Sequence, residues 1–133
     1  MSLIRFGVSL PQELSGQFDR LLKEKEYSNR SEAIRDLIRN ALVENAIQGN
    51  DPMVGVLSLI YDHHKRELQD KLTELQHDHV ETIVSAMHVH LDHENCLEVI
   101  IIRGKAAYIK NLADKMIAAK GIKHGHLYLT ISG

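Results

Sequence analysis

Three residues with metal-binding side chains lie close together in this chain. His88 and His90 are separated by one residue, and Cys96 follows six residues after His90. The apolar patterns of 83–91 and 96–103 predict two strands joined by a short polar loop. Because residues two apart in a strand point to the same face, both imidazoles could reach one ion, and a hairpin would bring the Cys96 sulfur beside them. The sequence therefore predicts a metal site with two imidazole ligands and one thiolate.

A fourth ligand is absent from this stretch. All nine histidines lie between His63 and His126, and His77 and His79 stand near the end of a predicted helix, from which another chain could supply one of them. A thiolate with three imidazoles suits Ni(II) or Cu(II) in a planar arrangement and Zn(II) in a tetrahedral one, so the residues alone leave the metal open. Glu98 could orient a ligand imidazole. The alternative is a coincidental histidine pair and a small buried cysteine.

The elements that must position these ligands follow a run of turn-forming residues at 48–52. The patterns predict strands at 54–61, 83–91, 96–103 and 125–131 and helices at 64–79 and 105–120. The order βαββαβ is that of a ferredoxin-like fold, with an antiparallel sheet and both helices on one side. The other face of the sheet would need a cover, so we expect self-association.

The residues before this module predict a strand followed by two helices. Residues 4–10 alternate between apolar and polar, Pro11 starts a helix, and Asn29 caps a second helix with Glu32 three residues later. One strand has no partner in its own chain, and so short a unit buries little apolar surface. Pairing with the same strand of a second chain would give a two-stranded antiparallel ribbon.

The outward face of such a ribbon would carry Arg5, Gly7 and Ser9 from each chain. A two-stranded ribbon fits the major groove of B-DNA, where arginine can bind guanine and serine can bind several base edges. Gly7 could contact DNA only through its backbone. The alternative is an ordinary solvated strand face.

Composition limits the remaining function classes. The chain has 133 residues, of which 44% are hydrophobic and 26% charged, a globular balance. No apolar run approaches the ~20 residues of a membrane span. One cysteine excludes an internal disulfide, and the first residues lack the pattern of a secretory signal, so we expect a cytoplasmic protein. The net charge of −2 does not by itself indicate a nucleic-acid binder.

Residues 5–11 and 28–36 resemble the ribbon-helix-helix repressors. Together with His77, His88, His90 and Cys96, the chain resembles the nickel-responsive transcriptional regulators of the NikR type. The resemblance covers residues 3–131. It implies that the second module is an ACT-like regulatory domain and that the protein is a homotetramer, a dimer of dimers. It also implies a square-planar Ni(II) site made by His88, His90 and Cys96 of one chain and His77 of a neighbouring chain.

We therefore expect an α+β protein with a ribbon-helix-helix domain at 1–48 and a ferredoxin-like, ACT-like domain at 53–133. The resemblance implies a nickel-dependent repressor that binds double-stranded palindromic operator DNA. A first alternative is a ribbon-helix-helix repressor that senses another metal or a small organic ligand through its ACT-like domain. A second is a small metalloenzyme, for which the chain leaves little room for a pocket and a general base, so we expect no enzymatic activity.

Overall fold

The computed structural model describes residues 2–131. The chain divides after Ala41 into two compact units, and helix α2 (Arg30–Gln48) extends through the division. Its last turns belong to the second unit, where Ala46 is buried in the core with Val43 and Ile47 packed against it. Each helix among residues 2–131 is too short or too polar to cross a membrane.

The first unit contains helix α1 (Gln12–Glu24) and the beginning of α2. The predicted start after Pro11 and the predicted cap are confirmed, because Oδ1 of Asn29 accepts a hydrogen bond from the Glu32 backbone N–H at 3.0 Å. The Glu32 carboxylate reaches back to the amide of Ser28 at 3.4 Å, one residue earlier than the usual capping box. A bidentate ion pair between Arg30 and Asp19, at 2.8 and 2.9 Å, joins the two helices.

The strand predicted at residues 4–10 is not formed in the single chain. Residues 2–11 carry no regular secondary structure, and the large apolar side chains of this segment are exposed, from 43% for Leu10 to 89% for Ile4. A strand requires a hydrogen-bonded neighbour, and in residues 2–131 nothing pairs with this segment. The prediction of a strand is therefore wrong for the single chain, in which the expected partner, a second copy of the segment, is not present.

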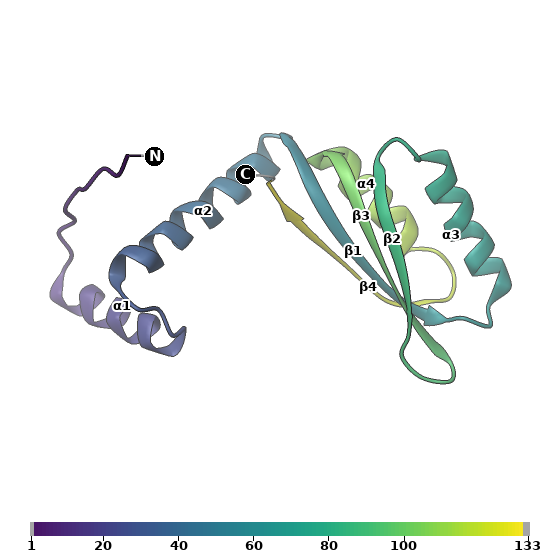
Figure 1. Cartoon of the computed structure of the whole chain (residues 1–133), viewed down its shortest axis with the longest axis horizontal. Coiled ribbons are helices and arrows are strands. Elements are labelled where there is room, and N and C mark those ends of the chain that lie inside the picture. Colours follow the sequence, from purple (N-terminus) through teal and green to yellow (C-terminus); the bar gives the residue numbers. More distant parts are fainter. Residues whose placement is uncertain (1, 132–133) are drawn as a thin grey trace. The chain divides into compact units, whose positions relative to one another are not determined.

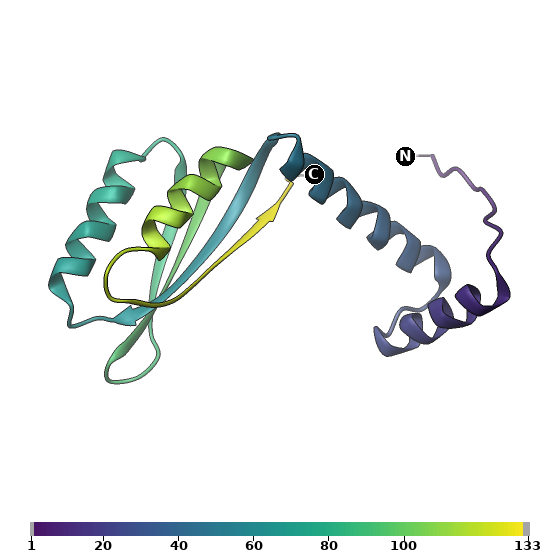
Figure 2. The ribbon, with the colours of Figure 1, turned by 180° about the vertical axis from the view of Figure 1, so that it is seen from behind.

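The second unit is a four-stranded antiparallel sheet covered on one side by two helices (Figure 1, Figure 2). The sheet order is β2-β3-β1-β4, with α3 and α4 on the same face. The predicted βαββαβ order is confirmed. The elements are β1 (Pro52–Asp62), α3 (Arg66–Asp78), β2 (Ile83–His90), β3 (Asn95–Lys105), α4 (Ala106–Ile117) and β4 (Ile122–Thr130).

Alternate residues of β1 and β3 form the core beneath the helices. Leu57, Leu59, Ile100 and Ile102 are fully buried there, together with residues such as Leu72 and Met116 of α3 and α4. The intervening residues of the strands face away from the helices. Among them Met87, Val89 and Tyr128 are exposed by 57%, 37% and 59%, so this open face is apolar and uncovered within one chain.

Candidate metal centre

The hairpin of β2 and β3 places the predicted ligands opposite one another. His88 is paired with Glu98, and His90 is paired with Cys96. Directly paired residues of antiparallel strands project from the same face. Cys96 and Glu98 are buried on the helix side of the sheet, so all four side chains emerge on that side. The histidines stay exposed because β2 is an edge strand.

Cys96 and His88 are in contact. The Sγ atom of Cys96 lies 3.9 Å from Nδ1 of His88, and the cysteine is only 2% exposed. The other ring nitrogen of His88, Nε2, lies 3.4 Å from Oε2 of Glu98. One imidazole thus faces a thiol with one nitrogen and a carboxylate with the other. This arrangement leaves Nδ1 for a metal ion while the carboxylate orients the ring.

Glu98 is the one charged residue in the buried core of the described chain, with 1% exposure. Its Oε1 accepts a hydrogen bond from the Tyr61 hydroxyl at 2.7 Å, and its Oε2 accepts one from Gln76 at 2.6 Å. A buried carboxylate is tolerated only with such partners. Burial, and next the hydrogen bond to Glu98, raise the pKa of Tyr61 far above its ordinary value, so this hydroxyl stays a donor.

Sequence reasoning singled out Glu98 but missed Tyr61 and Gln76. Tyr61 lies in β1 and Gln76 in the last turn of α3, and no local motif links either residue to the β2–β3 hairpin. The one local signal in the sequence was Ser58, a polar residue within the apolar run, which assigns residues 57, 59 and 61 to the opposite face of the strand. In the structure this face is buried under the helices.

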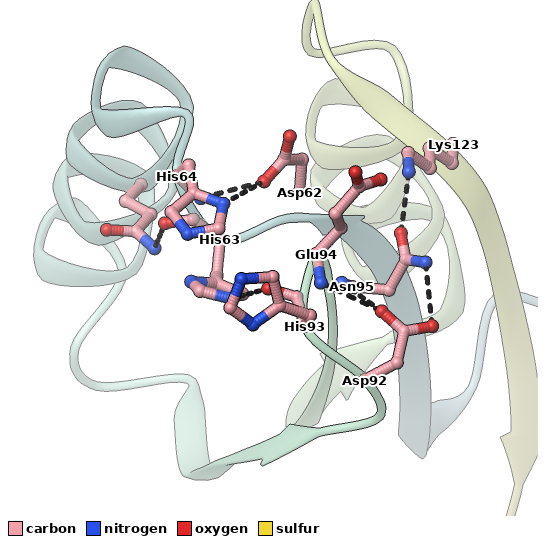
Figure 3. Close-up of polar contacts among 9 residues, drawn as sticks. Asp62, His63, His64, Asp92, His93, Glu94, Asn95 and Lys123 are labelled. Atoms are coloured by element: carbon pink, nitrogen blue, oxygen red, sulfur yellow. Dashed lines mark hydrogen bonds and ion pairs between the residues drawn. The ribbon is translucent and has the colours of Figure 1, made fainter.

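The His90 ring is turned toward a cluster of histidines. It stacks on His63, with ring centroids 4.8 Å apart and ring planes within 16°. His63 in turn lies 4.0 Å from the ring of His64 and donates from Nε2 to the carbonyl oxygen of His93 at 2.8 Å (Figure 3). Strand pairing therefore places the backbone of His90 beside that of Cys96, but the His90 ring points toward His63.

His77 lies away from this hairpin. It is exposed in the last turn of α3, directly after Gln76, whose side chain points to Glu98. Because successive helical residues diverge by about 100°, the His77 side chain leaves the helix in another direction. Accordingly, no group of three or more His, Cys, Asp and Glu side chains within residues 2–131 is arranged to hold a metal ion. One chain presents a partial donor set, a thiol beside an imidazole, whose chemistry fits Ni(II), Cu(II) or Zn(II).

The three predicted DNA-contacting residues lie together in the first unit. Arg5, Gly7 and Ser9 are all exposed in the segment 2–11, which carries no regular secondary structure. A Cβ atom at Gly7 would meet nothing within 4 Å. Within one chain, packing therefore does not require a glycine at this position.

Both units match known protein families. Residues 54–130 match the family described as "NikR C terminal nickel binding domain", and residues 4–44 match "Ribbon-helix-helix protein, copG family".

The whole chain also has close relatives. It is 56% identical over 131 residues to a protein of Geobacter sulfurreducens, covering 98% of this chain and 94% of the relative. It is 51% identical over 132 residues to a protein of Caldanaerobacter subterraneus, covering 98% of this chain and 86% of the relative. Both proteins carry the name "Putative nickel-responsive regulator".

Among solved structures, an uncharacterised protein of Thermotoga maritima has a TM-score of 0.53 at 14% identity. The similarity covers 59% of this chain and 98% of that one. At this identity the similarity concerns the fold alone.

Proposed function

This chain belongs to the nickel-responsive regulators, ribbon-helix-helix DNA-binding proteins with a nickel-binding C-terminal domain, and we propose which of its residues bind nickel, contact DNA and join the chains. The family is one of transcriptional regulators and not of enzymes, and its ligand is nickel rather than a small organic molecule.

We assign the nickel ligands to His88, His90 and Cys96 of one chain and His77 of a neighbouring chain. The observation that carries this assignment is the contact of the Cys96 thiol with Nδ1 of His88, backed by the buried Glu98 carboxylate. To join them, the His90 ring leaves His63 and rotates toward Cys96, its partner on the neighbouring strand. When bound, Ni(II) supplies a link between two chains. The exposure of His77, on a helix face turned away from Glu98, suits a ligand donated to another chain.

We further propose a homotetramer, a dimer of dimers. Two features of the single chain support it. The segment 2–11 exposes a row of apolar side chains and unpaired backbone groups, which a second copy would pair. The open face of the sheet exposes Met87, Val89 and Tyr128, which further copies would cover.

DNA binding is assigned to the ribbon formed by two N-terminal segments, with Arg5, Gly7 and Ser9 facing the major groove of a palindromic operator. Nickel can favour the DNA-competent arrangement only by binding it more tightly than the alternatives. Ligands contributed by two chains meet this requirement, because a complete ligand set exists only in the arrangement that brings His77 to the neighbouring hairpin.

The proposed ligands are tested by Cys96→Ser and His88→Ala. Each variant should lose stoichiometric tight Ni(II) binding in equilibrium dialysis and the nickel-dependent mobility shift of operator DNA, while its circular dichroism stays unchanged. His124→Ala, an exposed histidine of β4, is the matched control and should behave as the wild type. A Cys96→Ser variant that bound Ni(II) and shifted DNA at wild-type concentrations would overturn the assignment.

The intersubunit origin of His77 has a separate test. Neither His77→Ala nor Cys96→Ser should assemble a complete site alone. Mixed tetramers of the two should recover the Ni–thiolate absorption in a fraction of sites, because an intact His77 of one chain can meet an intact hairpin of the other. Mixtures with no more absorption than the separate variants would refute the shared site.

A further inference from the structure

The loop between the two proposed ligands His90 and Cys96 is closed by a network of hydrogen bonds. Oδ1 of Asp92 accepts the backbone N–H groups of Glu94 and Asn95 at 2.9 and 2.7 Å, and its Oδ2 accepts the Asn95 side-chain amide at 3.1 Å. The Leu91 amide donates to the Asn95 carbonyl oxygen at 2.9 Å. Asn95, the residue next to Cys96, is therefore the centre of this turn.

A residue from the opposite edge strand of the sheet contacts the Asn95 side chain. Nζ of Lys123 donates to Oδ1 of Asn95 at 2.6 Å (Figure 3). Lys123 is in β4, which does not adjoin β3, because β1 lies between them in the sheet. The lysine therefore spans the end of β1 and ties the hairpin loop to the opposite edge strand.

We propose that Lys123 is a positioning residue for the nickel site, which holds Asn95 and thereby fixes the β3 end that carries Cys96. This inference rests on the proposed nickel ligands. The physical reason is the geometry of the hairpin, whose two ends bear His90 and Cys96 with the Asp92–Asn95 turn between them. The hydrogen bond from Lys123 to Asn95 restricts the conformations of the adjacent Cys96 thiol in the metal-free protein. Less conformational entropy is therefore lost when Ni(II) binds. Mutation of residues that hydrogen-bond directly to metal ligands typically changes metal affinity by 10- to 100-fold. Lys123 acts one residue further away, through Asn95, so we expect an effect at the lower end of this range.

The test compares Lys123→Met with Lys120→Met by competition of each protein with a chelator for Ni(II). Both substitutions remove one positive charge from an exposed position close to β4, but Lys120 precedes the strand and has no bond to the hairpin among the described contacts. Electrostatics alone would make both variants bind a cation slightly more tightly. We expect Lys123→Met to bind Ni(II) about 10-fold more weakly, and Lys120→Met to bind it as the wild type does. Lys123→Arg keeps a donor of similar reach and should bind Ni(II) more tightly than Lys123→Met.

A second readout needs no nickel. In the metal-free protein, Lys123→Met should speed hydrogen exchange at the Glu94 and Asn95 amides and alkylation of Cys96 by iodoacetamide, while the midpoint of thermal unfolding stays unchanged. Adding Lys123→Met to Asn95→Ala should cause no further loss of Ni(II) affinity, because both substitutions remove the same hydrogen bond.

Wild-type affinity in Lys123→Met, an equal loss in Lys120→Met, or additive losses in the double variant would each overturn the positioning role. These outcomes differ from failure of the nickel site itself, in which Cys96→Ser would retain tight Ni(II) binding.

Discussion

The Tyr61 hydroxyl donates a hydrogen bond to Oε1 of Glu98 at 2.7 Å, although the strand partner of Tyr61 is Cys96. The contact therefore runs diagonally across β1 and β3, from beside the proposed thiolate ligand to the carboxylate next to His88. Gln76 donates to the other oxygen of Glu98 from helix α3. Three elements thus fix one buried carboxylate behind the proposed metal ligands.

Removing this hydroxyl should destabilise the protein. Tyr61→Phe leaves Oε1 of the buried Glu98 without a donor, and such an unsatisfied buried group costs about 1–3 kcal/mol. Urea unfolding of the metal-free protein measures the loss. Thr73→Val is the control, since it removes a hydroxyl that is exposed on α3 and has no hydrogen bond among the described contacts, and it should change the free energy of unfolding little. Equal effects of the two substitutions would contradict the role given to the hydrogen bond.

Glu98→Gln should weaken nickel binding by about 10- to 100-fold. The amide removes the negative charge that faces Nε2 of His88 and introduces N–H donors among the donors of Tyr61 and Gln76. The measurement is Ni(II) competition with a chelator, with Glu94→Gln, an exposed loop residue, as the control. Unchanged affinity in Glu98→Gln would show that the carboxylate does not support the imidazole.

Two glycine substitutions should have opposite signs. A Cβ atom at Gly55 would lie 2.6 Å from Cγ2 of Ile109, so Gly55→Ala forces α4 away from β1 and should destabilise the protein by about 1–3 kcal/mol. Gly16 lies within α1 with nothing near its Cβ position, and Gly16→Ala should stabilise the helix by about 0.5–1 kcal/mol. Thermal unfolding at fixed protein concentration measures both. A Gly55→Ala variant as stable as the wild type would show that the helix and sheet pack less closely than described.

The ion pair between α1 and α2 should give a measurable pH dependence. The hydrogen bond from Arg30 lowers the pKa of Asp19 below its ordinary value. A carboxyl group whose pKa is lower in the folded state stabilises that state above the pKa of the unfolded chain and loses this effect as pH falls through the folded pKa. Arg30→Ala should therefore raise the Asp19 pKa and remove this dependence below about pH 4. An NMR titration of the Asp19 side chain measures the change, and an unaltered titration midpoint would contradict the pairing.

Arg5→Ala should weaken operator binding by about 1–3 kcal/mol if the arginine binds a guanine. Fluorescence anisotropy of the nickel-loaded protein with operator DNA, at several salt concentrations, measures the affinity and the salt slope. Arg66→Ala, an exposed arginine at the start of α3, is the control and should change neither. An unchanged affinity and slope in Arg5→Ala would remove this residue from the DNA interface.

The order of elements in the second unit could be predicted from the sequence alone, and so could the common side of β2 on which His88 and His90 lie. Alternation in the strands and helical spacing in α1, α3 and α4 are local properties, so they can be read without knowing which segments meet. The same alternation places His88 and His90 on one side of β2, and the short loop brings Cys96 opposite His90. Asn29 capped α2 as predicted, because a cap acts within a few residues.

The side chains that surround those ligands could not be predicted, because they come from elements that are distant in the sequence. Tyr61 and Gln76 reach Glu98 from separate elements, and Lys123 reaches Asn95 across an intervening strand. Contacts of this kind depend on the order of the strands and the placement of the helices, and one sequence pattern is compatible with several such arrangements. The strand predicted at 4–10 is a different case. Its alternation is clear, but among the described residues nothing pairs with this segment, and its pairing with a second chain is a proposal. Local periodicity specifies a segment, whereas pairing and burial depend on what folding or assembly brings beside it.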